Sequence, residues 1–337
     1  MPAPALTGLS PNQGPTAGGN TVTLTGTSLG DVTTVFFGTT AVAFSIVSAT
    51  QITATAPPGA AGNVQVTVVS PGGTSGGLAY FYVALPTLTT LSPTQGPVAG
   101  GTSVTLNGTN LSQVTAVRFG TSSAAFAIVS ATQLNAVAPS APAGTPGAAQ
   151  VTVVSPGGTS AGLPYFYAAL PTLTSLSPTQ GPTTGGNTVT LTGTNLLNAS
   201  SVRFGTTTAT FSVVNSTQIN ATAPARTAGS VQVTAITPGG TSGGVGYQYV
   251  APPTLTTLSP SQGPTTGGNT VTLTGTNLTN VTAVLFGATA TAFSVVSATQ
   301  VTAVAPAGSA GSVQVTVTSP GGTSGGLTYT RITPPLV

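Results

Sequence analysis

The chain has 337 residues, of which four are basic and one is acidic, and it contains no cysteine, histidine or tryptophan. This composition excludes disulfides, thiolate or imidazole metal sites and most acid–base chemistry, so we expect no enzyme, no metal and no cofactor. One acidic residue, Asp31, cannot supply the carboxylates of repeated calcium sites. The basic residues are scattered, which argues against a nucleic-acid partner despite a calculated pI of 9.6; they are Arg118, Arg203, Arg226 and Arg331.

One phrase near the N-terminus, SPNQGPTAGGNTVTLTG from Ser10 to Gly26, recurs in close copies that begin at Ser92, Ser177 and Ser259. The period exceeds 80 residues, which is too long for a solenoid repeat of roughly 20–50 residues but long enough for a small domain with its own core. We therefore expect four tandem domains, over residues 1–84, 85–169, 170–251 and 252–337.

Within each copy the predicted elements are strands, and the fourth copy shows them most clearly. The stretch 270–276 alternates strictly, with Val271 and Leu273 on the buried face and threonines on the other. Further runs of this kind follow at 283–287, 293–295, 313–319 and 327–329. Clusters of Gly and Pro separate them at intervals typical of an all-β sandwich, and no segment has helical periodicity.

The Gly-Pro and Gly-Gly pairs of the repeated phrase are interpreted as turn residues between the first two strands. Proline fixes φ and glycine permits positive φ, so Gly14-Pro15 and Gly18-Gly19 suit a tight turn. A phosphate-binding loop is the alternative, but no lysine follows and no helix is expected there.

Aromatic residues are expected mainly in the core. Phe37, Phe119, Phe204 and Phe286 hold the same inward position in a VxFG element of each copy. The tyrosines fall on the last strand of each copy and are interpreted as residues at the rim of the core, rather than as a site; they are Tyr80, Tyr82, Tyr165, Tyr167, Tyr247, Tyr249 and Tyr329.

The order of these motifs carries a family resemblance. SPxxGPxxGGxxVTLxGxxL is followed by VxFGxxxA, a strand that ends in AP, VxVTVxxPGGTS and LxYxY. This order closely resembles the TIG/IPT domain, the immunoglobulin-like domain of plexins, some transcription factors and many bacterial surface proteins, and it covers nearly the whole chain four times. The resemblance implies a sandwich of about seven strands per domain. It implies no single function, because the family serves adhesion, spacing and DNA binding.

Each domain follows the previous one with almost no linker, and prolines restrict the junctions at Pro86, Pro171 and Pro252-Pro253. We therefore expect four Ig-like sandwiches in a semi-rigid rod. No signal peptide and no membrane-spanning segment is visible, and the expected location is extracellular or on a cell surface.

The near absence of charge leaves the strand edges without the lysines that usually protect them. Two functions follow from that surface, a passive spacer or a fibre-forming array that associates with itself or with other structural subunits. An adhesin segment that binds a surface protein or a glycan, and a decoration or fibre protein of a virion, stay open as alternatives.

The candidate interface lies at the outward position x of VxFG. The two middle copies place Arg118 and Arg203 there, whereas the terminal copies place Phe36 and Leu285. Chance variation among the four copies is one explanation; the other is that Phe36 and Leu285 mark surfaces where the terminal domains contact other subunits.

Overall fold

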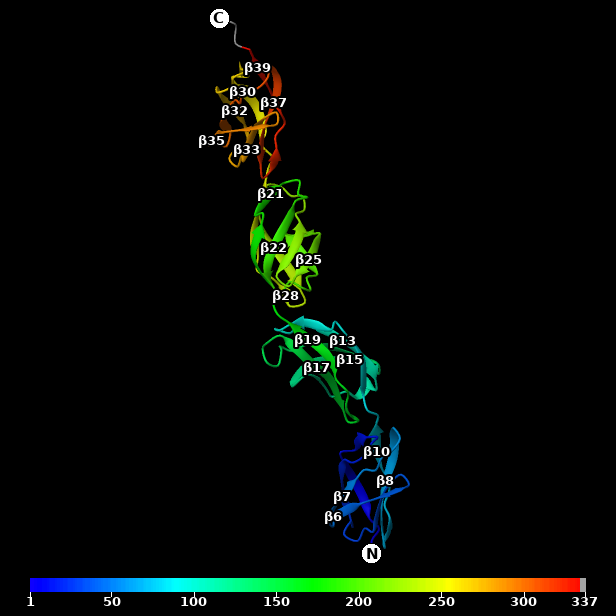
Figure 1. Ribbon diagram of the computed structural model, residues 1–337. Helices are drawn as coiled ribbons and strands as arrows, with labels where there is room; N and C mark the ends of the chain where they lie inside the picture. The colour runs from blue at the N-terminus through cyan, green and yellow to red at the C-terminus, as the bar shows by residue number, and fades with distance from the viewer. Residues whose placement is uncertain (334–337) are drawn as a thin grey trace. The chain divides into compact units, whose positions relative to one another are not determined.

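The computed structural model describes residues 1–333, which form strands and connecting turns (Figure 1). This described part contains no α-helix, and its one 3-10 turn is η1 at Leu111–Gln113. The strands repeat as four units, each with a separate hydrophobic core. The predicted all-β class and the four repeated sheet units are therefore confirmed. By its internal contacts the chain divides into two compact parts, Met1–Ala169 and Leu170–Val337, which hold two repeats each.

The first part contains the first nineteen strands. The first repeat is formed by β1 Ala5–Ser10, β2 Gln13–Pro15, β3 Thr21–Thr27, β4 Thr34–Phe37, β5 Thr40–Val42, β6 Phe44–Ser48, β7 Gln51–Thr55, β8 Gly62–Ser70, β9 Gly73–Thr74 and β10 Leu78–Val83. The second is formed by β11 Thr87–Ser92, β12 Gln95–Pro97, β13 Ser103–Thr109, β14 Ala116–Phe119, β15 Ser122–Ser130, β16 Gln133–Val137, β17 Gly147–Ser155, β18 Gly158–Thr159 and β19 Leu163–Ala168.

The second part repeats this order. The third repeat is formed by β20 Thr172–Ser177, β21 Gln180–Pro182, β22 Thr188–Thr194, β23 Ser201–Phe204, β24 Thr207–Ala209, β25 Phe211–Asn215, β26 Gln218–Thr222, β27 Gly229–Thr237, β28 Gly240–Thr241 and β29 Val245–Val250. The fourth is formed by β30 Thr254–Ser259, β31 Gln262–Pro264, β32 Thr270–Thr276, β33 Ala283–Phe286, β34 Thr289–Thr291, β35 Phe293–Ser297, β36 Gln300–Val304, β37 Gly311–Ser319, β38 Gly322–Thr323 and β39 Leu327–Ile332.

Each repeat is built from the same two sets of strands. In the first repeat one sheet has the order β1-β3-β7-β6, and the other has the order β2-β10-β8-β4-β5 with β9 paired to β8. The third and fourth repeats match it. In the second repeat β15 runs unbroken from one set to the other, so that a single nine-stranded sheet results. The strand count exceeds the roughly seven that the resemblance implied, because short segments such as β2, β5 and β9 pair as separate strands.

The core of each repeat is centred on a phenylalanine and a tyrosine from two strands that flank a third, as β4 and β10 flank β8 in the first repeat. Phe204 is fully buried and meets Tyr247 edge to face, with 5.1 Å between the ring centroids. The equivalent Phe–Tyr pairs of the other three repeats also have centroids 5.1 Å apart. Such pairs add stability beyond the burial of their area. The predicted inward position of all four phenylalanines is confirmed.

The Gly-Pro pair of the repeated phrase does not form the predicted turn. Gly14 and Pro15 belong to β2, which pairs in parallel with β10 at the edge of the second sheet. A Cβ on Gly14 would lie 2.1 Å from the hydroxyl oxygen of Tyr80, so glycine is required there by close approach rather than by its φ. The Gly-Gly prediction is confirmed, because Gly18 and Gly19 have φ of 68° and 86°.

The sheet edges are protected by irregular backbone rather than by charge. In the first repeat the edge strands β1 and β6 each carry a register shift, between Leu6 and Gly8 and between Ile46 and Ser48. The same two shifts occur in all four repeats. At the edges of the other sheet, β2 and β5 have three residues each, and β2 contains Pro15. Bulges, short strands and proline all hinder pairing with another chain.

The central phenylalanine gives the first testable prediction. Replacing Phe204 with alanine removes a fully buried ring and leaves a cavity, so the third repeat loses about 3–5 kcal/mol of unfolding free energy. Chemical denaturation of the full chain, monitored by amide hydrogen exchange in each repeat, shows whether the third repeat unfolds before its neighbours. Arg203→Ala, on the exposed side of the same strand, is the control and changes stability by less than about 0.5 kcal/mol. A loss below about 1 kcal/mol for Phe204→Ala would contradict the core assignment.

Candidate functional site

The tyrosines of the last strands lie inside the core, not at its rim as the sequence suggested. Tyr80 and Tyr82 are 0% and 4% exposed, and their hydroxyls donate hydrogen bonds to Asn20 Oδ1 at 3.0 Å and to the Pro57 carbonyl at 2.7 Å. Asn20 comes from the repeated GGN phrase, and Pro57 follows β7. In the first repeat the last strand is thereby tied to the end of the first sheet at which β3 begins and β7 ends, which gives these tyrosines a structural role.

The fourth repeat replaces the second tyrosine with an arginine. Arg331 is 7% exposed, and its Nε donates to the Pro306 carbonyl at 3.2 Å. Tyr167 makes the equivalent bond to the Pro139 carbonyl at 2.9 Å in the second repeat. In the first, second and fourth repeats the proline of the Ala-Pro pair after this strand therefore presents its carbonyl to a donor on the last strand. Only the alignment of Arg331 with the LxYxY pattern indicates from the sequence that this arginine takes the place of a core tyrosine.

Burial changes the ionisation of these phenols. Desolvation, with a smaller repulsion from the neighbouring tyrosine, raises the pKa of Tyr167 and of Tyr249 to about 12, and Arg226 partly offsets this shift at Tyr249. Desolvation also raises the pKa values of Tyr80, Tyr82, Tyr165 and Tyr247. The phenols stay protonated and neutral across the ordinary pH range, which does not suit a general base.

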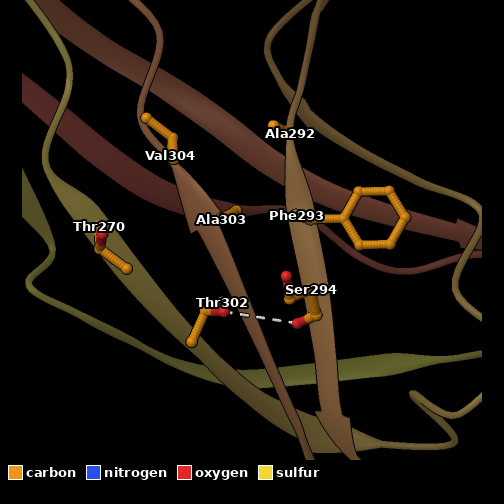
Figure 2. A pocket seen from close by; sticks show the side chains of 7 residues that line it. All are labelled: Thr270, Ala292, Phe293, Ser294, Thr302, Ala303 and Val304. Carbon is orange, nitrogen blue, oxygen red and sulfur yellow. Dashed lines mark hydrogen bonds between the residues drawn. The ribbon is translucent and has the colours of Figure 1, made fainter.

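A groove recurs on the outer face of the first sheet. In the fourth repeat it has a volume of about 180 Å³ and lies between the ends of β32, β35 and β36, where Ala292 separates β34 from β35 (Figure 2). Figure 2 shows Thr302 directed at Ser294, whose carbonyl accepts its hydroxyl hydrogen bond at 3.5 Å, while the Phe293 ring points the other way. Equivalent grooves of about 200 and 430 Å³ occur in the first and third repeats.

The chemistry of these grooves is limited to neutral hydrogen bonds. Their polar lining consists of threonine and serine hydroxyls, with Asn220 added in the third repeat. Such a lining can hold a polar, uncharged group but has no side chain that titrates near neutral pH. Sequence reasoning missed these grooves, because each depends on a single residue at which one strand leaves its sheet.

The candidate interface residues lie where alternation places them. Phe36 follows buried Val35 and precedes buried Phe37 on β4, and its own side chain is half-buried. Leu285 is half-buried in the equivalent place on β33, whereas Arg118 and Arg203 at this position are exposed. The four positions occur in separate repeats.

Two phenylalanines are exposed that sequence reasoning did not single out. Phe81 is 45% exposed on β10, and its paired neighbours on either side are Gln13 and Asn63. Phe166 is 49% exposed on β19, next to Gln95. The signal was present in the YFY sequence, since the residue between two inward tyrosines must point outward.

No helix in residues 1–333 is long and apolar enough to span a bilayer. A family model described as IPT/TIG domain matches residues 4–82, 86–167, 171–249 and 253–331. Plexin-A3 of Rattus norvegicus is 33% identical over 150 residues, which are 41% of this chain and 8% of that protein.

Similar solved structures come from plexins and from bacterial surface proteins. The full extracellular region of plexin A4 has a TM-score of 0.37 and 18% identity, over 90% of this chain and 34% of that one. Invasin, a bacterial integrin-binding protein, has a TM-score of 0.30 and 18% identity, over 97% of this chain and 79% of that one. SGBP-B of Bacteroides uniformis, from a xyloglucan utilization locus, has a TM-score of 0.24 and 20% identity, over 48% of this chain and 49% of that one.

The buried phenols predict how stability depends on pH. Between about pH 3 and 9 the unfolding free energy stays nearly flat, because one aspartate is the only acidic side chain and there is no histidine. Above about pH 10 the unfolded chain loses phenolic protons that the folded chain retains. The folded pKa values are raised, so their stabilisation is complete below about pH 10 and is lost as the pH rises toward 12.

Guanidinium midpoints measured from pH 3 to 11 test this profile. Tyr249→Phe is the informative variant, since within the described residues the Tyr249 hydroxyl makes no hydrogen bond that the substitution would remove. The third repeat of this variant should lose less stability above pH 10 than the same repeat of the parent chain. A midpoint that moves by several tenths molar between pH 3 and 9, or an alkaline loss unaffected by Tyr249→Phe, would contradict the prediction.

Proposed function

Because this chain belongs to the IPT/TIG domain family, with four domains in tandem, we propose that it is a non-enzymatic structural protein. Its role is that of a surface-exposed or fibre-forming array, which acts as a spacer or associates with itself. The domains extend over residues 1–84, 85–169, 170–251 and 252–337, and the location is extracellular or at a cell or particle surface.

The observation that carries this proposal is the independence of the four cores. Each repeat has a hydrophobic core made of its own residues, including its own Phe–Tyr pair. The tyrosine-bearing strand of each repeat packs in that same core. Such an array can be lengthened without a change in any single domain, as a spacer requires. The outward faces are mainly Thr and Ser, so little electrostatic repulsion opposes side-by-side association.

Self-association through strand edges is disfavoured by the bulges and the short edge strands. The association surface is therefore proposed at side chains on a sheet face, with Phe36 and Leu285 as its anchors. Burial of one such side chain contributes about 1.5–3 kcal/mol. That contribution is sufficient for an anchor within a small interface.

The test is the double variant Phe36→Arg and Leu285→Arg in the full chain. The fold accommodates arginine at this position in the two middle repeats, at Arg118 and Arg203. We expect a folded monomer under conditions where the parent associates. Circular dichroism reports the fold, and light scattering reports the mass.

The control adds the same charge at two other exposed apolar positions, as Phe166→Arg and Leu197→Arg. This control variant should associate as the parent does. If the first double variant associates as strongly as the parent, Phe36 and Leu285 are not the interface. If the parent chain is monomeric at every concentration, self-association is contradicted and the spacer role is the one that stands.

Binding of a neutral glycan is a second candidate function, favoured by the surroundings of Phe81. The exposed ring of Phe81 is flanked by Gln13 and Asn63 on the paired strands. A sugar ring can stack on the aromatic ring and form hydrogen bonds with the two amides. Electrophoresis in gels that contain a soluble neutral polysaccharide tests it. Retardation of the parent that is lost in Phe81→Ala supports glycan binding, and equal migration with and without the polysaccharide removes it.

A further inference from the structure

The segments between repeats lie against the repeat that follows them. In the first compact part the linker is Val83-Ala84-Leu85, between the matched domains that end at residue 82 and begin at residue 86. In the second part the equivalent linker is Val250-Ala251-Pro252. Both segments are contacted by two features of the following repeat, an asparagine after its third strand and a glycine of its PGGTS turn.

The asparagine contact is a side-chain hydrogen bond to the last linker carbonyl. Asn110 Nδ2 donates to the Leu85 carbonyl at 2.9 Å, and Asn277 Nδ2 donates to the Pro252 carbonyl at 3.0 Å. Asn195 donates in the same way to the Leu170 carbonyl at 2.9 Å. All three asparagines have φ of 57–58°, in the left-handed region that asparagine tolerates better than most residues. The amide reaches a carbonyl 25 residues upstream, so it does more than stabilise its own turn.

The glycine contact is a close approach of two backbones. A Cβ on Gly157 would lie 2.3 Å from the Ala84 carbonyl oxygen and 2.7 Å from that of Val83. A Cβ on Gly321 would lie 2.3 Å and 2.8 Å from the carbonyl oxygens of Ala251 and Val250. No other residue fits at these positions without a shift of the linker.

The first repeat shows the same surface with one member changed. A Cβ on Gly72 would lie 2.3 Å from the carbonyl oxygen of Pro2, so the turn contacts the preceding segment there too. The asparagine position is occupied by Ser28, which has φ of 57° but a side chain shorter by one atom. Ser28 therefore provides a natural comparison for the amide.

We propose that the second and fourth repeats each carry a docking notch, formed by the asparagine and the glycine of the PGGTS turn, for the extended three-residue segment that precedes the repeat. This inference rests on the proposed function, because a spacer benefits from junctions that do not flex. In the first part β10, the last strand of the first repeat, ends at Val83, and the carbonyl of this same residue is the first one that the notch contacts. No free residue therefore lies between the end of β10 and the start of the notch. Pro86 follows the last bound carbonyl and restricts φ. The linker is thus fixed by the domain it enters.

The notch predicts that removal of one amide loosens one junction. Two spin labels, introduced as Ser45→Cys and Ala127→Cys in a full chain that has no cysteine of its own, report the distance between the first and second repeats. The parent should give a narrow distance distribution. Asn110→Gly keeps the left-handed backbone accessible but removes the amide, and should broaden the distribution about twofold as the linker gains freedom.

Ser28→Gly is the matched control, since it makes the same kind of change at the equivalent position of the first repeat and should leave the distribution narrow. Gly157→Ala disrupts the glycine contact of the notch and should broaden the distance distribution as Asn110→Gly does. Thermal unfolding shows that each variant keeps its domains folded. A distribution for Asn110→Gly as narrow as that of the parent, or a parent distribution as broad as that of a flexible linker, overturns the notch. Either result leaves the proposed structural role in place, because that role is judged by the mass measurements.

Discussion

The contact on which each repeat depends is the edge-to-face pair between the VxFG phenylalanine and the first tyrosine of the last strand. It fills the space between the two sets of strands, and the tyrosine hydroxyl then reaches the polar side chain after the Gly-Gly turn, as Tyr80 reaches Asn20. Gly14 must be glycine because that hydroxyl occupies the place of its side chain. The phrase that occurs four times in the sequence therefore has two roles. Its Gly-Gly pair forms a turn, and its Gly-Pro glycine and the polar residue after the Gly-Gly pair contact the tyrosine hydroxyl.

Much of this fold could be predicted from the sequence, because strict alternation fixes which side chains are buried. Val271, Leu273 and Phe286 are buried as expected. The β2 strand could not be predicted, since three residues that include Gly and Pro look like a turn, and their parallel partner is nearly 70 residues away. The linker contacts were missed for the same reason, because they join residues that no local pattern connects, such as Asn110 and Leu85. The candidate interface positions were placed correctly on the strand, but their role stays a prediction.

A chain with so little charge has to protect its sheet edges by other means. The register shifts in both edge strands of the first sheet remove the straight row of donors and acceptors that a second chain would pair with. Among the described residues 1–333 the buried cation is Arg331, which lies where three repeats have a tyrosine and donates from its Nε to the equivalent proline carbonyl. Its long apolar stem allows it to occupy a core position while its head group is hydrogen-bonded. Neutrality is thus compatible with this fold because geometry, not charge, limits unwanted pairing.

The notch also bears on how an array of this kind can vary in length. Both halves of the notch lie downstream of the linker they hold, Asn110 and Gly157 for the linker that ends at Leu85. The structural repeat is therefore a linker together with the domain after it. A duplication of one full period would carry the linker, the asparagine and the glycine turn together, so the new junction would be complete from the start. A junction built from a surface between two domains would instead need matching changes on both neighbours, which makes the downstream notch the simpler way to keep many junctions alike.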